Sequence, residues 1–367
     1  MNVDKLKESW VQVAGHGGDI VAHWFYAHLF VHYPETRDLF PVSMAAQRDR
    51  LVQALGRIVS NVDQLDDLVP YLEDLGRDHR KFGALAAHFP AVGDSLLATL
   101  AHFSGGRWTA TLEADWAAAY GLVADVMTKA ADDAAQTTPA HWEARVTEVE
   151  QRAFDIAILR LSTDVPVPYQ AGQSLALEAT DIRPRLWRWY SPANPPGGTD
   201  IELHVRMVPG GAVSSALVRS SSVGDRVRLG PPIGHLALEP DSVRPVLMIA
   251  GGTGFAPLKA VIGQLAAAGE DRQVALYFGV RRVGDIYDYD ALEKLNAAHD
   301  WLTVTIVVSE DPVWPGPQGL VGEVALAAQD WSGHDVYVCG SPDMVAGTVQ
   351  MVIDRGIPTT QIRYDAY

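Results

Sequence analysis

Apolar residues recur at helical spacing through the first third of the chain. From about Asp4 to Asp133 the sequence is rich in Ala and Leu, and few segments alternate as strands do. The pattern predicts a helix over residues 17–33 and a new helix at Pro34, because proline suits a first helical turn. The long amphipathic run LEADWAAAYGLVADVMTKAA is the last helical pattern before the breaker TTP. We therefore predict an all-helical domain over residues 1–135.

The pattern changes near Trp142. The segments TEVEQRAFDIAILRL, SLALEA, DIELHVRMV and DRVRLG alternate or are rich in β-branched residues, and Gly/Pro turns separate them. Strands at this spacing are typical of a small antiparallel barrel, which we assign to residues 142–242.

A third pattern begins near Arg244. The runs VLMIA, VALYFGV, TVTIVVS and DVYVCG are short and almost continuously apolar, and helical stretches such as APLKAVIGQLAAAG lie between them. Apolar strands that alternate with helices indicate a parallel sheet covered on both faces. Residues 243–367 should form a doubly wound α/β nucleotide-binding domain. The predicted fold class is therefore multidomain: all-α, then antiparallel β-barrel, then α/β.

Length and charge narrow the choice of partners. A chain of 367 residues favours two or three domains, and 29 basic against 45 acidic residues give a net charge of -16. Such a surface repels nucleic acid. The start MNVDKLKESW lacks the apolar region of a signal peptide, and no uncharged apolar run approaches the roughly 18 residues that span a bilayer. We expect a cytoplasmic protein without a membrane partner.

The single cysteine, Cys339, excludes an intrachain disulfide and an iron–sulfur cluster held by several thiolates. If electrons pass through this chain, another cofactor must carry them.

A glycine-rich turn follows the first apolar strand of the third domain. It reads Gly251, Gly252, Thr253, Gly254, and a helix opens after it near Pro257. Glycines let the backbone approach a pyrophosphate, and a helix N-terminus supplies free N–H groups. Such a turn can also be an ordinary tight turn. The strand–turn–helix context favours a dinucleotide site, which NADH or NADPH would occupy.

Two further strand ends bear on this site. At FGVRR, Arg281 and Arg282 could pair with a 2′-phosphate, whereas Asp285 could accept a hydrogen bond from a free 2′-hydroxyl, so both nucleotides stay open. Cys339 and Gly340 lie at the carboxyl end of another strand, where open α/β sheets bind ligands. Taken by itself, Cys339 is better explained as a small buried apolar residue.

The segments RLWRWYSPAN and LHVRMVPGGAVSSAL resemble the flavin-binding barrel of the ferredoxin-reductase family. WRWY alone could be an aromatic strand, but the glycine motif and CGSP follow in the family's order. The resemblance implies that Arg188 neutralises the FAD diphosphate, that Tyr190 lies against the flavin ring and that Ser191 donates a hydrogen bond to it.

The same resemblance extends to two further segments. It implies that GGAVS offers backbone N–H groups and a hydroxyl to the diphosphate, through Gly211, Val213 and Ser214. It also implies that the last residue of IRYDAY, Tyr367, covers the flavin ring.

The helical third resembles the bacterial globins. In HWFYAHLFVHYPETRDLFP, Tyr26, Pro34 and Phe40 match a helix-B tyrosine, the proline of the next helix and a haem-packing phenylalanine. Continuing the match makes His79 the proximal ligand of haem iron and Gln47 a distal residue. The resemblance implies that Tyr26 and Gln47 hydrogen-bond oxygen held in the pocket.

A globin followed by such a reductase is the organisation of the flavohaemoglobins, which use haem b, FAD and NADH or NADPH. Two positions depart from the family. Where it usually has a tyrosine and a glutamate behind the proximal histidine, this chain has Phe89 and Ala131. Without that anionic support the imidazole gives less electron density to iron. These departures resemble a divergent bacterial subgroup for which D-lactate oxidation has been proposed.

The leading functional hypothesis is a nitric oxide dioxygenase, in which NAD(P)H electrons pass through FAD to a haem that converts NO and O2 to nitrate. A haem-linked flavin oxidoreductase with another donor, such as D-lactate, or with O2 as acceptor is the alternative. A redox or oxygen sensor is the third hypothesis. The expected partners are O2, NO and NAD(P)H, and the expected assembly is a monomer or weak dimer.

Overall fold

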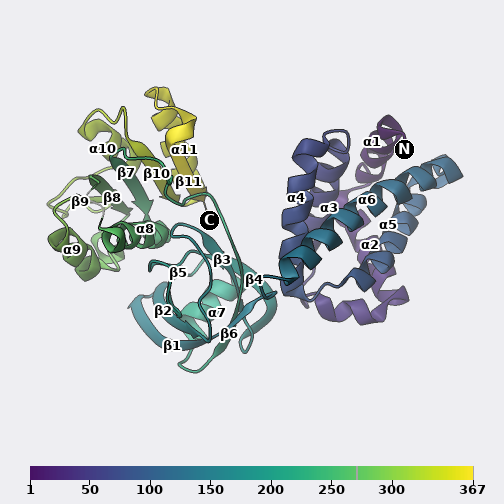
Figure 1. Cartoon of the computed structure of the whole chain (residues 1–367), viewed down its shortest axis with the longest axis horizontal. Helices are drawn as coiled ribbons and strands as arrows, with labels where there is room; N and C mark the ends of the chain where they lie inside the picture. Colours follow the sequence, from purple (N-terminus) through teal and green to yellow (C-terminus); the bar gives the residue numbers. More distant parts are fainter. Residues whose placement is uncertain (270–271, 367) are drawn as a thin grey trace. The chain divides into compact units, whose positions relative to one another are not determined.

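The computed structural model describes residues 1–269 and 272–366 and divides into two compact units, Met1–His141 and Trp142–Tyr367 (Figure 1). The predicted fold class is confirmed: the first unit is helical, and the second contains a curled antiparallel sheet followed by a parallel α/β sheet. The predicted limit at residue 242 lies inside the second unit.

The first unit is a helical bundle. Its α-helices are α1 (Val3–Ala14), α2 (Gly18–His32), α3 (Ala45–Ser60), α4 (Leu65–His79), α5 (Phe89–Ser104) and α6 (Ala110–Ala135). Short 3₁₀ turns join them: η1 (Pro34–Leu39), η2 (Arg80–Phe82), η3 (Ala86–His88) and η4 (Gly105–Arg107). Side chains cap two N-termini, since Asn2 accepts from the Lys5 N–H at 3.1 Å and Thr109 accepts from the Leu112 N–H at 3.2 Å.

A glycine brings α4 onto α6. A Cβ added at Gly76 would lie 2.3 Å from the carbonyl oxygen of Met127, closer than any side chain permits. One turn later Arg80 donates to the carbonyl of Thr138, at 2.5 Å. The later of these two residues, at the end of α4, contacts the later of the two partners on and after α6. The end of α4 therefore runs parallel to the C-terminal part of α6 and beside it.

The second unit begins with the antiparallel sheet. Its strands are β1 (Trp142–Ala153), β2 (Ile156–Thr163), β3 (Ser174–Ala179), β4 (Arg183–Tyr190), β5 (Asp200–Arg206) and β6 (Arg226–Ile233), in the order β4-β3-β6-β1-β2-β5. An antiparallel bridge between Pro192 and Leu203 joins the two edges, so the sheet curls into a barrel. Helix α7 (Ala212–Ser220) follows β5.

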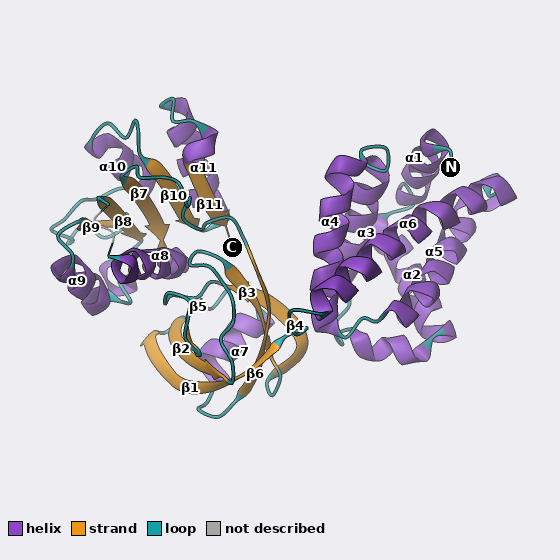
Figure 2. Cartoon of the chain, in the orientation of Figure 1, coloured by secondary structure: helices purple, strands orange, loops and turns teal. Residues whose placement is uncertain are grey.

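The parallel sheet has the order β11-β10-β7-β8-β9. Its strands are β7 (Val246–Gly251), β8 (Val274–Val280), β9 (Leu302–Val308), β10 (Asp335–Gly340) and β11 (Ile362–Ala366). Its helices are α8 (Phe255–Ala268), α9 (Tyr289–Ala298), α10 (Val321–Ala328) and α11 (Pro342–Asp354), and its 3₁₀ turns are η5 (Gly252–Gly254), η6 (Val283–Asp285) and η7 (Thr359–Gln361). Helices α8 and α9 pack on one face, and α10 and α11 pack on the other (Figure 2). Both faces are covered, which explains the continuous apolar strands.

Within the described residues, no single helix is long and apolar enough to cross a membrane. One pair, Leu65–Phe82 with Ala86–Arg107, passes jointly on length and composition, but it is bent by 99°.

Candidate functional site

A large cleft lies between the barrel and the parallel sheet of the second unit. Its volume is about 1630 Å³. Of the residues predicted to bind FAD or the nicotinamide nucleotide, the cleft is lined by Arg188, Tyr190, Ser191, Gly211, Val213, Ser214, Gly251, Gly252 and Thr253. Two motifs predicted from separate parts of the sequence therefore meet at one cavity, which is large enough for two dinucleotides side by side.

The predicted glycine turn has the geometry of a phosphate-binding turn. Strand β7 ends at Gly251, the turn η5 follows, and α8 begins at Phe255. Gly252 has a φ of +54°, a conformation that side chains rarely adopt. The free N–H groups at the start of α8 lie directly after it, and the predicted Pro257 is buried in this first turn.

The remaining predicted residues of this site are buried beside the turn. A Cβ on Gly254 would lie 2.3 Å from the carbonyl oxygen of Cys339, and a Cβ on Gly340 would lie 3.3 Å from the Gly251 Cα. The Cys339 side chain is fully buried in β10. These residues bring β10 close to the turn, and a direct contact between Cys339 and the nucleotide stays a prediction.

The flavin motif lies where β4 leaves the barrel. Burial holds the pKa of the Tyr190 hydroxyl well above its ordinary value. Ser191 is buried, and its Oγ lies 2.9 Å from the Oγ of Ser174, which donates in turn to Asp365 on β11 at 3.4 Å. The Arg188 guanidinium donates to the Trp187 carbonyl at 2.8 Å, beside the cleft. Tyr367 lies outside the described residues.

The second flavin segment forms the start of α7. Ser214 Oγ accepts from the Val208 N–H at 3.1 Å, and a Cβ on Gly211 would lie 2.6 Å from that oxygen. Gly211 therefore lets the chain fold tightly at the helix N-terminus. Val213 is buried. The free N–H groups of this turn border the cleft, as a diphosphate site requires.

At the far end of the cleft, the carboxyl ends of β8 and β9 lie side by side. Arg281, Asp285 and Glu310 line this end. The Arg281 Nε lies 3.8 Å from a Glu310 oxygen, and Asp285 accepts from the Arg282 N–H at 3.1 Å. Glu310 was not predicted. It follows its strand by two residues, and only the pairing of β8 with β9 places it beside Arg281.

Sequence reasoning also missed Arg206, the last residue of β5. It lines the cleft, and its Nη1 lies 3.3 Å from where a Cβ on Gly252 would stand. Arg206 belongs to the segment LHVRMVPGG that carries the flavin resemblance. The alternation of that strand places Arg206 on the face opposite the buried Ile201, Leu203 and Val205, which point into the barrel core.

In the globin unit, the predicted distal residues come together. Tyr26 on α2 is buried, and burial raises the pKa of its hydroxyl to about 12, although a hydrogen bond with Gln47 opposes the rise. The rings of Tyr26 and Phe40 meet edge to face, with centroids 5.3 Å apart. Gln47 reaches Tyr26 from the first turn of α3. The hydroxyl therefore stays protonated and can donate a hydrogen bond.

The predicted iron ligand is the last residue of α4. Nδ1 of His79 lies 2.7 Å from the carbonyl oxygen of Leu75, one turn earlier. Burial lowers the pKa of His79, while this hydrogen bond and Asp78 oppose the shift. With Nδ1–H donated to the carbonyl, the neutral ring presents the Nε2 lone pair, which is the form that binds haem iron.

The surroundings of His79 include both departures from the family. Phe89 packs with Leu75, Leu72 and Met127 in an apolar cluster. Ala131 lies on α6, one helical turn after Met127, the residue that Gly76 of α4 contacts. Further along the chain, Thr138 accepts a hydrogen bond from Arg80, which directly follows His79. Ala131 therefore lies alongside the turn that carries His79, and neither position can supply an anionic hydrogen-bond acceptor.

Family models match three consecutive parts of the chain: the globin model over residues 23–127, the oxidoreductase FAD-binding domain over 143–238 and the oxidoreductase NAD-binding domain over 248–350. The chain is 34% identical over 224 residues to the ferredoxin–NAD(P)+ reductase component of the naphthalene 1,2-dioxygenase/salicylate 5-hydroxylase systems of Ralstonia sp., a match that covers 60% of this chain and 67% of the relative.

Two other similarities cover almost the whole chain. A flavohemoprotein from Bacillus subtilis (strain 168) is 25% identical over 391 residues, covering 99% of this chain and 96% of the relative. The crystal structure of a flavohemoglobin from Malassezia yamatoensis with bound FAD and heme matches with a TM-score of 0.79 at 17% identity, covering 99% of this chain and 98% of that one. At that identity the structural match establishes the fold.

The fold and the three models define the class: a globin joined to an FAD- and NAD(P)H-dependent oxidoreductase. The chain belongs to the flavohaemoglobin family, and it is an enzyme whose cofactors are haem, FAD and NAD(P)H. The side chains fit these groups: the His79 imidazole is oriented by a carbonyl, the cleft has the volume for FAD and a nucleotide, and Gly252 leaves the turn open to a pyrophosphate.

Proposed function

We propose that this protein is a nitric oxide dioxygenase that takes its electrons from NAD(P)H. In the balanced reaction, two NO and two O2 with one NAD(P)H give two nitrate ions, one NAD(P)+ and one proton. The observation that carries the proposal is the buried Tyr26 hydroxyl, which forms a hydrogen bond with Gln47. In the same unit the Leu75 carbonyl orients the ring of His79, the predicted iron ligand. The proposal also agrees with the fold of the second unit, which is shared, at 22% identity, with the FAD/NAD-binding domain of a nitric oxide dioxygenase from Vibrio cholerae.

The bound groups would supply redox chemistry: FAD exchanges two electrons with the nucleotide, and haem iron takes them one at a time. The chain has to bind and orient the reactants. Arg188 and the N-terminus of α7 would hold the FAD diphosphate, while the glycine turn before α8 would hold that of the nucleotide. Both sites border one cleft, so the two ring systems can meet without crossing solvent.

In the globin unit, Tyr26 would hold a proton where negative charge develops on the reacting gas. A neutral phenol donates a strong hydrogen bond to such charge. Because the pKa of Tyr26 is raised to about 12, the proton stays on the hydroxyl through the physiological range. Gln47 fixes the direction of that hydroxyl, and the apolar rings around it exclude water.

Product analysis tests the proposal. The holoenzyme is given NO, NADH and ¹⁸O2, and the nitrate is examined by mass spectrometry. We expect two labelled oxygen atoms in each nitrate and two nitrates for each NADH consumed. Nitrite as the main product, or unlabelled nitrate, would reject the dioxygenase proposal.

The apolar proximal side favours a second candidate, an oxidoreductase that uses O2 as its acceptor or draws on another donor. Because Nδ1 of His79 donates to the neutral Leu75 carbonyl, the imidazole pushes less electron density toward iron than one paired with a carboxylate. Peroxide or superoxide formed in proportion to NADH consumed, without NO, would favour this candidate. Haem reduction by D-lactate without nucleotide would identify the other donor.

The expectations of a monomer or weak dimer and of a cytoplasmic location stay predictions. Sedimentation velocity of the FAD- and haem-loaded protein tests the first, and fractionation of the native host tests the second.

A further inference from the structure

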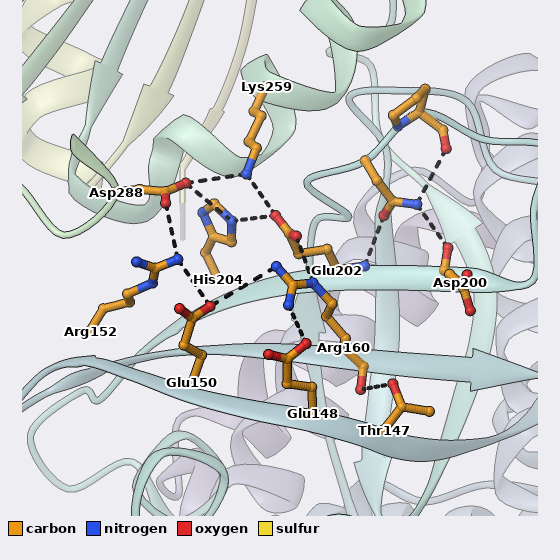
Figure 3. A network of polar contacts seen from close by, with 12 residues as sticks. Thr147, Glu148, Glu150, Arg152, Arg160, Asp200, Glu202, His204, Lys259 and Asp288 are labelled. Carbon is orange, nitrogen blue, oxygen red and sulfur yellow. Dashed lines mark hydrogen bonds and ion pairs between the residues drawn. The ribbon is translucent and has the colours of Figure 1, made fainter. Parts of the chain in front are cut away.

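We propose that a buried polar network, with Lys259 at its centre, positions the nicotinamide nucleotide against the flavin (Figure 3). The network joins the barrel to the parallel sheet within the second unit. We call it the β5–α8 network, and it consists of Arg152, Glu202, His204, Lys259, Tyr287 and Asp288. Its members act through the elements that they join, so they are positioning residues.

Strand β5 presents two of these side chains to the parallel sheet. The alternating residues Ile201, Leu203 and Val205 pack in the barrel core. Glu202 and His204 therefore lie on the opposite face of the strand. His204 is wholly buried, and its Nε2 lies 2.9 Å from a Glu202 carboxylate oxygen. This face of β5 is polar although it is covered.

Two separate contacts meet this face from the side of the parallel sheet. The first comes from α8, where Lys259 Nζ lies 2.8 Å from the Glu202 carboxylate and 3.2 Å from that of Asp288. The second comes from the segment after η6, where the Tyr287 hydroxyl lies 2.7 Å from Nδ1 of His204. Strand β5 is thus joined both to α8 and to the segment that leads into α9.

Both joined segments border the predicted nucleotide site. Helix α8 begins directly after the glycine turn Gly252–Gly254, and Lys259 lies about one helical turn past its first residue. Asp285 lines the far end of the cleft, and its carbonyl accepts from the Tyr287 N–H at 2.9 Å. The network therefore holds both ends of that site against the barrel that carries the flavin motif.

Charged groups give this contact a single register. Apolar contact is non-directional, and its worth follows the buried area, which changes little when two surfaces slide slightly. Hydrogen-bonded ion pairs are directional, and buried paired charges are costly to separate. Such networks add little net stability, and fixing a register is their best-attested use. Asp288 is almost fully buried, so its pairing with Lys259 belongs to this kind.

The reaction that depends on this register is hydride transfer. A hydride, which carries two electrons and one proton, leaves C4 of the nicotinamide and bonds to N5 of the flavin, so NAD(P)H becomes NAD(P)+ and FAD becomes FADH−. The reacting atoms must come within about 3.5 Å, and a misplacement of about 1 Å can cost a hundredfold in rate. Binding of each diphosphate does not depend on the distance between the rings. Loss of register should therefore slow the transfer and leave binding unchanged.

Lys259→Met removes the tie that α8 contributes to the network, while each carboxylate keeps another cation. Glu202 retains Arg160 at 3.3 Å, and Asp288 retains Arg152 at 3.6 Å. Both carboxylates stay paired, so the variant should fold.

The test compares Lys259→Met with a matched control, Lys294→Met, in the FAD- and haem-loaded protein. Lys294 is an exposed lysine on α9. Anaerobic stopped-flow absorbance measures flavin reduction by NADH, calorimetry measures the Kd of ADP-ribose, and absorbance after gel filtration measures bound FAD.

We expect flavin reduction in Lys259→Met to slow by about ten- to a hundredfold. The long-wavelength charge-transfer absorbance of the nicotinamide–flavin pair should weaken, because the two rings no longer stack closely. The ADP-ribose Kd and the FAD content should match those of the wild type. Lys294→Met should match the wild type in every assay.

Two further variants separate register from general damage. Lys259→Arg keeps the charge and should restore most of the rate of flavin reduction. Tyr287→Phe removes one hydroxyl from the same network and should slow flavin reduction by less than Lys259→Met, which provides a second test if Lys259→Met is unstable.

Two results would overturn the proposal. Flavin reduction at the wild-type rate in Lys259→Met and Tyr287→Phe would mean that the network does not position the nucleotide. Slower reduction accompanied by weaker ADP-ribose binding or loss of FAD would mean that the network supports the binding sites themselves and not their register. None of these assays uses NO, so the outcome is independent of the dioxygenase proposal.

Discussion

The two units hold their chemistry in different ways. In the reductase unit, each predicted binding segment is contiguous: strand, glycine turn and helix N-terminus follow one another, and the fold brings two such segments to one cleft. In the globin unit the predicted residues are single side chains on α2, α3 and α4. In the proposed sites, backbone groups would do most of the binding in the reductase unit, and side chains would do so in the globin unit. Removing one side chain should therefore abolish binding in the globin unit, whereas the reductase unit should be most sensitive to substitutions that change the backbone.

The globin unit contains a second contrast, between its distal and proximal sides. Tyr26 and Gln47 form a polar pair, whereas Nδ1 of His79 donates to the Leu75 carbonyl, with Phe89 and Ala131 at the positions where the family usually has a tyrosine and a glutamate. The chain thus keeps the group that we propose to stabilise charge on a gas, whereas Phe89 and Ala131 cannot supply the anionic acceptor that strengthens electron donation by an imidazole.

The largest expected effect separates the two units. His79→Ala removes the proposed iron ligand, so the purified protein should lose most of its haem while it retains FAD and NADH–ferricyanide activity. The measurement is the haem-to-FAD ratio from absorbance. His102→Ala, at an exposed histidine stacked on Trp24, is the control. Normal haem content in His79→Ala would remove His79 from the ligand role.

Gly254→Ala should impair the reductase unit and leave the globin unit intact. Its Cβ would lie 2.3 Å from the Cys339 carbonyl, so β10 and the glycine turn cannot keep their spacing. We expect NADH–ferricyanide activity to fall by about a hundredfold or more, with haem content retained. Gly121→Ala, which meets open space on α6, should behave as wild type. Full activity in Gly254→Ala would show that the close approach is dispensable.

Tyr26→Phe tests whether the Tyr26 hydroxyl stabilises bound O2. It removes the hydroxyl but keeps the ring that packs on Phe40, so the globin should fold and bind haem. Dissociation of O2 should speed up by about ten- to a hundredfold, the worth of one hydrogen bond to a charged acceptor. Stopped-flow displacement of O2 by carbon monoxide measures this rate. An unchanged rate of O2 dissociation would mean that the Tyr26 hydroxyl does not stabilise bound O2.

The choice of nucleotide should depend on the carboxylates at the end of the cleft. Arg281 is already beside Glu310, and Asp285 lines the same end, so a 2′-phosphate would meet negative charge. We expect kcat/KM to favour NADH over NADPH by roughly tenfold or more. Glu310→Gln should narrow the ratio by improving the use of NADPH. A wild-type preference for NADPH would contradict this account.

The smallest effect is a dependence of stability on pH. Burial lowers the pKa of His204 below 6.5. Burial alone would raise the pKa of Glu202, but hydrogen bonds from His204 and Lys259 outweigh it and hold that pKa below 4.5. Both groups bind protons more weakly in the folded state than in the unfolded state. Their contribution to the free energy of unfolding is therefore fully present above their unfolded pKa values and is lost as the pH falls through and below those values.

The temperature of flavin release should therefore fall from about pH 8 to about pH 5. His204→Gln, which does not titrate, should have a lower release temperature at neutral pH and a shallower decline. Parallel curves for the two proteins would mean that His204 does not contribute to the decline.

The fold class and the contiguous segments could be predicted because periodicity and turn chemistry are local. Hydrophobic runs located the sheets, and the glycine turn was found from its strand–turn–helix context. Glu310 and Arg206 could not be found in this way, because strand pairing and the packing of β5 against α8 place them. Gly76 gave no signal either, since its importance depends on a backbone atom of Met127 about fifty residues later.

Consumption of NO by the haem- and FAD-loaded protein in air tests the central claim most directly, followed with an electrode, first with NADH and then with NADPH. The account predicts sustained consumption that stops when the nucleotide is exhausted and that Tyr26→Phe slows. A single burst, equal in amount to the haem and unchanged by added nucleotide, would contradict it.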